Sequence, residues 1–375
     1  MAVSESPLSP ELVLFYTTAL ESRPTYRRGI LDCLSYPNGH VLQYSYRMSQ
    51  IQCELRGESV LPRGSGGVII YVDEARPHQY KYYPLRRVRV LSGLPADRQN
   101  TLTGRERVSI LLELHEFVGY ADTHNPTQWD ERITPFDVLR KFSGTSPKFF
   151  VTRAADIFTK ASVSELSAWE DVVTNLAGSH DLASAIFINL EHPQDFDTRR
   201  PLVLDKASDT PRYDVLPGEV YRLNMAVYDG KGRETKLKLT SSSDDLIQVN
   251  QPFQSVVSGL TQKSALIACK RSIEKRLVAL SIEVVDDSQQ AQKGMVNSPN
   301  PTLLMRVAVP RWTVVKFFVL VASGAFFVSW DPDLIKEIFG IPHFKLVGLI
   351  VKGAGAIFLA LAAWIGFRKL PSASA

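Results

Sequence analysis

One short segment, Tyr80–Arg89, alternates basic and aromatic residues and is a candidate for ligand contact. In an extended strand Arg87 and Arg89 share one face, while the neighbouring valines point to the other face. Cations beside tyrosines can clamp phosphates and stack on bases or sugars, which predicts a cytosolic protein or a nucleotide- or nucleic-acid-bearing partner. A solvated strand face with aromatic packing across strands gives the same pattern. The candidate binding residues are Lys81, Arg86, Arg87 and Arg89.

The sequence lacks the local motifs of catalysis and metal binding. The loop over residues 64–67 precedes a strand instead of a helix and lacks the Gly-Lys-Ser/Thr ending of a phosphate loop, which favours a hairpin loop. The seven histidines show no metal-ligand spacing, and Ser179, His180 and Asp181 are consecutive, so their side chains diverge. We therefore expect no metal, no cofactor and no enzymatic activity, although a site assembled from distant residues stays open.

Two long apolar runs, residues 312–330 and 346–367, lie near the C-terminal end and are separated by a short polar loop. At about 1.5 Å per residue, a helix over either run could cross a hydrocarbon core of about 30 Å. The runs predict a two-helix transmembrane hairpin over residues 312–367. A pair of buried helices is the alternative, but buried helices of that length seldom lack a polar face.

The charges around the two runs predict how such a hairpin would be oriented. Arg306 and Arg311 precede the first run and Arg368 follows the second, whereas the loop between them is acidic on balance. We expect a multi-pass protein of the inner (plasma) membrane, with the soluble part and both termini in the cytosol. Three widely spaced cysteines fit a reduced compartment. The formal net charge of +4 is milder than a compact nucleic-acid binder usually carries.

Small residues and one lysine form a stripe along the second run, at steps of three and four residues. Small residues let helix backbones approach closely, and a lysine on the same stripe would face protein, water or an anionic headgroup. Packing in a homo-oligomer is one interpretation and a pore lining is the other; membrane lipids are the expected surroundings. The candidate residues are Gly348, Lys352, Gly355 and Gly366, with Lys316 in the first run.

Residues 1–192 predict a cytosolic, β-rich α/β recognition module. Extended runs over residues 29–36 and 40–47 flank the turn sequence Pro37-Asn38-Gly39, which predicts a β-hairpin. The alternation over residues 105–120 favours a further strand. Ser162 to Glu165 fits a capping box, and apolar residues at helical spacing predict a helix that ends at Gly178.

Residues 200–286 predict an antiparallel β-sandwich that resembles an immunoglobulin-like domain. About seven short segments alternate apolar and polar residues at regular intervals, so that each has one dry face and one wet face. Residues 287–303 are rich in Gln, Ser and Asn and predict a flexible linker. The predicted fold class is α+β and mostly β, with three parts: the N-terminal module, the sandwich and the transmembrane hairpin.

This layout, a cytosolic sensing part joined to transmembrane helices, resembles the transmembrane effectors of bacterial anti-phage defence. The resemblance implies a recognition module that controls a membrane hairpin able to oligomerise and perturb the membrane. A scaffold or binding protein that holds a cytosolic partner at the membrane is the alternative. A membrane-anchored enzyme with a non-local site is the third interpretation.

Overall fold

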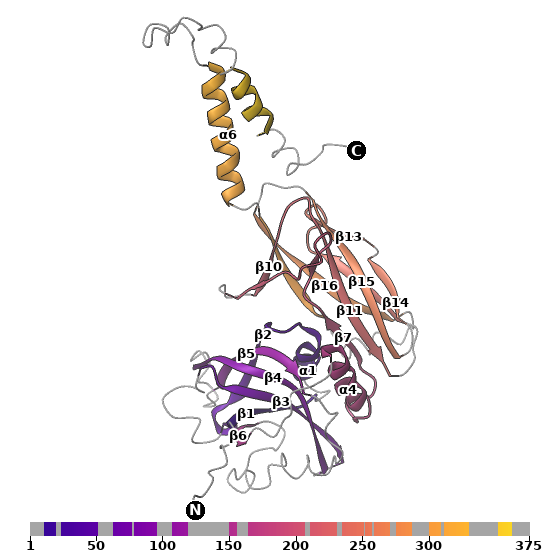
Figure 1. Ribbon diagram of the computed structural model, residues 1–375. Helices are drawn as coiled ribbons and strands as arrows, with labels where there is room; N and C mark the ends of the chain where they lie inside the picture. Colours follow the sequence, from indigo (N-terminus) through magenta and orange to yellow (C-terminus); the bar gives the residue numbers. More distant parts are fainter. Residues whose placement is uncertain are drawn as a thin grey trace, which may run out of the picture.

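The computed structural model describes most of the N-terminal part, the sandwich and two C-terminal helical segments (Figure 1). The described residues are 11–19, 24–51, 63–76, 79–95, 107–118, 150–155, 164–206, 211–230, 235–250, 252–256, 259–270, 275–286, 300–308, 311–329 and 352–361.

The N-terminal part is built on a six-stranded sheet with the order β2-β5-β4-β3-β1-β6. Its strands are β1 (Glu11–Thr17), β2 (Val41–Arg47), β3 (Gly66–Arg76), β4 (Gln79–Pro95), β5 (Arg107–Phe117) and β6 (Phe150–Ala155). The β1 and β3 strands are parallel, and the other pairs are antiparallel. The predicted strand over residues 105–120 is confirmed as β5.

Two helices lie between this sheet and the sandwich (Figure 1). Helix α1 (Pro24–Ser35) occupies the segment predicted as the first strand of a hairpin, so that prediction is wrong. Pro24 is preorganised for the first helical position, and Ile30, Leu31 and Leu34 recur at helical spacing and are buried. Helix α4 (Glu165–Ala177) confirms the second predicted helix, and Ser164 caps it by accepting a hydrogen bond from the backbone N–H of Ser167.

The sandwich consists of two sheets. The first has the order β14-β12-β16-β17-β10-β9 and the second β13-β15-β11-β7, with β8 also paired to β11. The strands are β7 (Ile186–Leu190), β8 (Gln194–Asp195), β9 (Leu204–Asp205), β10 (Arg212–Val215), β11 (Val220–Asp229), β12 (Thr235–Ser241), β13 (Ile247–Asn250), β14 (Phe253–Val256), β15 (Gly259–Cys269), β16 (Arg276–Asp286) and β17 (Thr302–Val307). Alternate residues such as Leu223, Leu239 and Ile267 are fully buried between the sheets.

The predicted mostly-β class with several sheets is confirmed, while the immunoglobulin-like assignment stays a prediction. Three described strands, β7, β8 and β17, extend the sandwich beyond residues 200–286. The strand β7, assigned to the N-terminal module, pairs with β11, and β17, at the end of the predicted linker, lies between β16 and β10. The division of the chain into folding units stays a prediction. One cluster of buried residues runs from the N-terminal sheet through both helices into the sandwich.

The C-terminal helices are α6 (Arg311–Ser329) and a second helix over residues 352–361. Among the described residues no helix is long and apolar enough to cross a membrane. The predicted transmembrane hairpin, and the multi-pass inner-membrane localisation drawn from it, are therefore wrong for this part of the chain. Arg311 and Lys316 lie in the first two turns of α6. The described second helix is about 15 Å long, about half of a hydrocarbon core.

Candidate functional site

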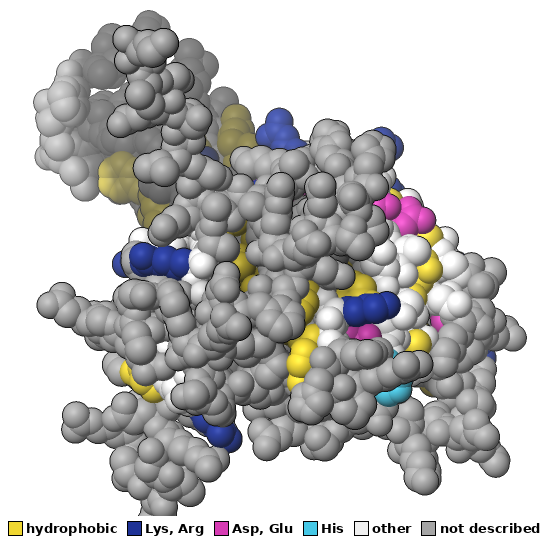
Figure 2. Space-filling view, turned by 90° about the horizontal axis from the view of Figure 1, so that it is seen from below, with side chains coloured by type: hydrophobic (Ala, Val, Ile, Leu, Met, Phe, Trp, Pro, Cys, Tyr) yellow, Lys and Arg dark blue, Asp and Glu magenta, His cyan; other side chains and the backbone are white. Residues whose placement is uncertain are grey.

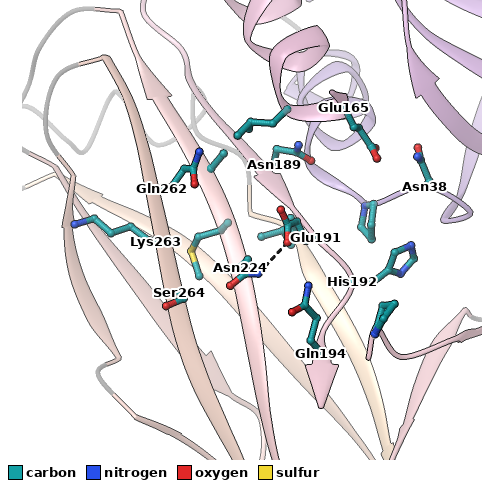
Figure 3. Close-up of a pocket in the computed structure, with 16 residues that line it drawn as sticks. Asn38, Glu165, Asn189, Glu191, His192, Gln194, Asn224, Gln262, Lys263 and Ser264 are labelled. Atoms are coloured by element: carbon teal, nitrogen blue, oxygen red, sulfur yellow. Dashed lines mark hydrogen bonds between the residues drawn. The ribbon is translucent and has the colours of Figure 1, made fainter. Parts of the chain in front are cut away.

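A cleft lies where the N-terminal part meets the sandwich, and its volume is about 560 Å³ (Figure 3). That volume falls in the range of small-molecule and peptide sites. The turn after α1 and the first turn of α4 form one wall, and the strands β7, β11 and β15 form the other. The lining residues are Pro37, Asn38, Glu165, Leu166, Asn189, Leu190, Glu191, His192, Gln194, Pro201, Asn224, Met225, Ala226, Gln262, Lys263 and Ser264.

Polar side chains on the cleft side come from neighbouring strands of one sheet face. The ladder pairs Asn189 with Ala226, Ala226 with Gln262, and Asn224 with Ser264. Because paired residues share a face, these side chains all project away from the sandwich interior. Alternate positions such as Leu223 are buried between the two sheets. The floor of the cleft is therefore rich in carboxamides, which can both donate and accept hydrogen bonds.

Asn189 is the least expected of these side chains. It is 7% exposed and lines the cleft, yet its carboxamide makes no hydrogen bond to any residue that the structure describes. Most of the side chain is buried, but its carboxamide oxygen and nitrogen are not among the fully enclosed, unpaired polar atoms of the described residues, so they are open to the cleft. The side chain is thus positioned to bind a polar group that enters the cleft.

Two carboxylates face the cleft beside Asn189. The carboxamide Nδ2 of Asn224 donates to Glu191 Oε2 at 2.9 Å, which fixes that carboxylate at the end of β7 (Figure 3). Glu165, the first residue of α4, is half exposed, and its Oε1 lies 3.8 Å from the Arg86 guanidinium. Burial raises the pKa of Glu165, and the nearby Glu191 acts in the same direction while Arg86 opposes it. Negative charge therefore accumulates at this end of the cleft.

His192 closes the same end. Its Nδ1 lies 2.9 Å from the hydroxyl of Tyr213, and burial lowers the pKa of its imidazole. A contact with the backbone of Asn38 opposes that shift, but Lys206 and Arg86 reinforce it. The ring is therefore neutral at pH 7 and adds no positive charge beside the two carboxylates. The ammonium of Lys263 lies on the opposite side of the cleft and points away from them (Figure 3).

The buried cation Arg86 holds the turn that forms one wall. Its Nη1 donates to the carbonyls of Cys33 and Tyr36, at 2.8 and 2.6 Å, and its Nη2 donates to Asn38 Oδ1 at 2.7 Å. Its Nε donates to the carbonyl of His115 at 2.5 Å. The first two carbonyls lie at the C-terminal end of α1, where the helix dipole favours a cation. Burial lowers the pKa of Arg86 to about 10, so the group stays charged at neutral pH.

A second contact joins the two parts beside this turn. Glu113 of β5 is almost fully buried, accepts hydrogen bonds from Arg89 of β4, and pairs with Lys206, which follows β9 of the sandwich. Burial alone would raise the pKa of Glu113, but the two cations outweigh it and hold this pKa below its ordinary value. The Tyr36 hydroxyl also accepts from the backbone N–H of Thr302 in β17, at 3.0 Å.

The structure does not bring the four predicted binding residues together as a phosphate clamp. Arg86 is fully buried, Arg89 is paired with Glu113, and Arg87 lies 3.9 Å from Glu116. Lys81 is exposed near the other end of β4. On the face seen from below, the described basic side chains are scattered (Figure 2). The role of this strand in ligand binding stays a prediction.

The stripe predicted for oligomer contacts is partly described. Gly355 is buried against α6, because a Cβ added at Gly324 would lie 3.1 Å from the Gly355 carbonyl oxygen. Lys316 and Lys352 are exposed. The small residues thus bring two helices of one chain together. Gly348 and Gly366 lie outside the described residues.

The cleft is not visible in the sequence, because its lining comes from six separate stretches of the chain. No spacing along the chain connects Asn38, Glu165 and Asn224. One signal was available: Asn189 interrupts an otherwise apolar strand, Ile186–Leu190, and a carboxamide inside a buried strand requires a partner.

The sequence matches no protein-family model, and no curated protein is significantly similar to it. Part of the chain is similar to solved β-domain structures. The MSP-domain-like protein SSP-19 of Caenorhabditis elegans is 16% identical, over 25% of this chain and 92% of that one, with a TM-score of 0.19. The PapD-like domain 7 of human CEP192 is 10% identical, over 26% and 82%, with a TM-score of 0.19. These low TM-scores carry no argument about function.

Proposed function

We propose that this chain is a recognition protein of the receptor or effector type, which binds a polar ligand in the cleft between the N-terminal part and the sandwich. The observation that carries this proposal is Asn189, a mostly buried side chain that lines the cleft and has no hydrogen-bond partner among the described residues. A ligand that enters the cleft can hydrogen-bond to this carboxamide in place of solvent, and the burial around the side chain fixes its position for that bond. An anti-phage role stays a prediction from the resemblance of layout.

The position of the cleft suggests how binding would be transmitted. Pro37 and Asn38 line it, and the same turn holds Arg86 and borders Lys206. A ligand that contacts this turn therefore acts on the residues that hold the N-terminal part against the sandwich. The N-terminal part and the sandwich could pack in two arrangements. A ligand would shift the balance between them only if it binds one arrangement more tightly than the other.

A blocking substitution tests the proposal. Ala226 lies on the cleft floor, so Ala226→Trp would fill the space without entering the sandwich core. Thermal unfolding of the full chain is measured with panels of tripeptides, nucleotides and sugars. A ligand at about 100 times its Kd stabilises the folded state by about 2.7 kcal/mol. We expect at least one compound of these panels to raise the melting temperature of the wild type but not that of Ala226→Trp.

The matched control is Ser255→Trp, which adds the same side chain at an exposed position on β14 of the other sheet. The control should respond to ligands as the wild type does. If no ligand distinguishes Ala226→Trp from the other two proteins, the cleft is not the recognition site and the proposal fails.

A further inference from the structure

The charge and hydrogen-bonding groups of the cleft restrict what it can bind. Glu165 and Glu191 contribute carboxylates that only accept hydrogen bonds, and the carbonyl of Asn189 adds a third acceptor. The neutral His192 does not compensate these charges, and the Lys263 ammonium points away from them. A bound group that supplies several N–H donors and a positive charge would satisfy all three residues.

Arg86 does not fill this role, although it lies behind Glu165. Its donors go to three backbone carbonyls and to Asn38 Oδ1, and the guanidinium stacks on Phe117 at 4.2 Å. Its separation of 3.8 Å from Glu165 Oε1 exceeds hydrogen-bond length. The cleft side of Glu165 thus remains open to a second cation.

From these contacts we infer that the cleft binds the guanidinium group of an arginine side chain, presented by an extended peptide segment of a partner protein. This inference rests on the proposed function and specifies its ligand class. A guanidinium is planar and carries five donors in a rigid fork, which suits two carboxylates and a carboxamide better than an ammonium does. Leu166 lines the same cleft and provides apolar surface for the methylene stem.

The size of the cleft distinguishes a peptide from a free guanidinium compound. A volume of about 560 Å³ exceeds the space that one side chain requires, and it extends to Gln262 and Ser264 on β15. The carboxamide of Gln262 and the hydroxyl of Ser264 can pair with the backbone N–H and C=O groups of an extended peptide. We therefore expect an arginine peptide to bind more tightly than methylguanidine, which carries the charged group alone.

Calorimetric titration of the full chain tests the inference with acetyl-Gly-Arg-Gly-amide and the same peptide containing citrulline or lysine. Citrulline keeps the shape of arginine but has no charge. The arginine peptide should bind at least tenfold more tightly than either analogue, and more weakly as salt is raised. Equal binding of the citrulline peptide would overturn the cationic class while leaving the proposed recognition cleft intact. Tighter binding of methylguanidine than of the peptide would overturn the peptide source.

Two substitutions locate the binding. Asn189→Leu replaces a carboxamide that has no described partner by an apolar group of similar size, so the protein should fold with unchanged or higher melting temperature and lose arginine-peptide affinity at least tenfold. Glu191→Gln should weaken binding similarly, whereas Glu283→Gln, the same change at an exposed site on β16, should not. Wild-type affinity in Asn189→Leu would overturn the assignment. If no ligand of any class binds the wild type, the proposed function fails with it.

Discussion

Arg86 was predicted as a ligand contact, a role that stays a prediction; in the structure it is fully buried and donates to backbone carbonyls at the end of α1. Arg86 and Val88 are two residues apart in β4, so both lie on the same, buried face of the strand. This placement could have been predicted from the sequence. The sequence does not reveal its partners. They are backbone carbonyls at the end of α1 and the side chain of Asn38, which only the folded chain brings within reach.

Replacing Arg86 by lysine should destabilise the protein strongly. A lysine has one ammonium and cannot reach the four acceptors that the guanidinium fork holds, so buried carbonyls would lose their partners. We expect Arg86→Lys to lower the free energy of unfolding by at least about 3 kcal/mol, measured by urea denaturation. Arg89→Lys is the control, since Arg89 is half exposed and should cost less than about 1 kcal/mol. Equal effects would contradict the structural role of Arg86.

His40 should make stability depend on pH. Its ring stacks on Tyr36 at 3.9 Å, and burial lowers its pKa to about 4, with the nearby Arg86 and His192 acting in the same direction. The unfolded chain, with a pKa near 6.5, binds this proton more readily than the folded protein. Stability should therefore fall as pH falls from about 6.5 to 4, by up to about 1.4 kcal/mol per pH unit from this group.

The variant His40→Phe keeps an aromatic ring against Tyr36 but cannot be protonated. Urea denaturation at a series of pH values should give a shallower slope between pH 6.5 and 4 than in the wild type. The burial-lowered pKa values of His115 and His192 act in the same direction as His40, whereas the burial-raised pKa values of Asp32 and Glu165 act against it; all four groups remain in the variant. An unchanged slope would show that His40 is not the main titrating group.

At the scale of elements, the turn between α1 and β2 connects the cleft to the contact between the two parts. The sequence predicted this turn from Pro37-Asn38-Gly39 but placed a strand before it, because apolar residues in Gly29–Tyr36 suit a strand as well as a helix. Tertiary packing decides between them: Ile30 and Leu34 are buried when the segment is helical. The sandwich strands were predictable because each has one wet and one dry face.

Two glycines allow the role of this turn to be measured. Gly39 and Gly64 both have positive φ, 81° and 90°, so alanine at either position should cost about 1 kcal/mol of backbone strain. A Cβ at Gly39 would also lie 2.8 Å from Lys206 Nζ, whereas at Gly64 nothing lies within 4 Å. Gly39→Ala should therefore destabilise the protein more than Gly64→Ala, because Lys206 must move away from Glu113.

A double-mutant cycle isolates that contact. In a Lys206→Ala background the costs of Gly39→Ala and Gly64→Ala should become equal, when both are measured as free energies of unfolding. If Gly39→Ala still lowers the free energy of unfolding more than Gly64→Ala when Lys206 is absent, the difference comes from the backbone. The turn would then not be coupled to the contact between Lys206 and Glu113.

At the scale of the whole molecule, the C-terminal helices carry an apolar surface that no other described residue of the chain covers. Gly324 and Gly355 bring the helices together, but Val315, Phe318 and Phe326 of α6 and Ile357 of the second helix remain exposed. Exposed apolar patches on helices commonly mark association sites. We propose that this surface packs against the same helices of a second copy, as the predicted homo-oligomer requires.

Light scattering after size exclusion measures this association. The wild type should elute above the mass of one chain, and Phe318→Ser with Phe326→Ser should shift it toward the monomer. The control, Val203→Ser with Leu277→Ser, removes two exposed apolar side chains from the sandwich and should leave the oligomer unchanged. A monomeric wild type, or equal effects of both pairs, would contradict the proposal.

Hydrogen exchange measured by mass spectrometry, with and without saturating acetyl-Gly-Arg-Gly-amide, tests most directly whether one ligand occupies the cleft and contacts both of its walls. We expect slower exchange at residues 37–40 and 164–167 on one wall and at residues 191–194 on the other, all near the lining residues. Exchange in β14, on the other sheet, should not change. Protection confined to the exposed face of β4, or present on one wall alone, would contradict a recognition site built between the two parts.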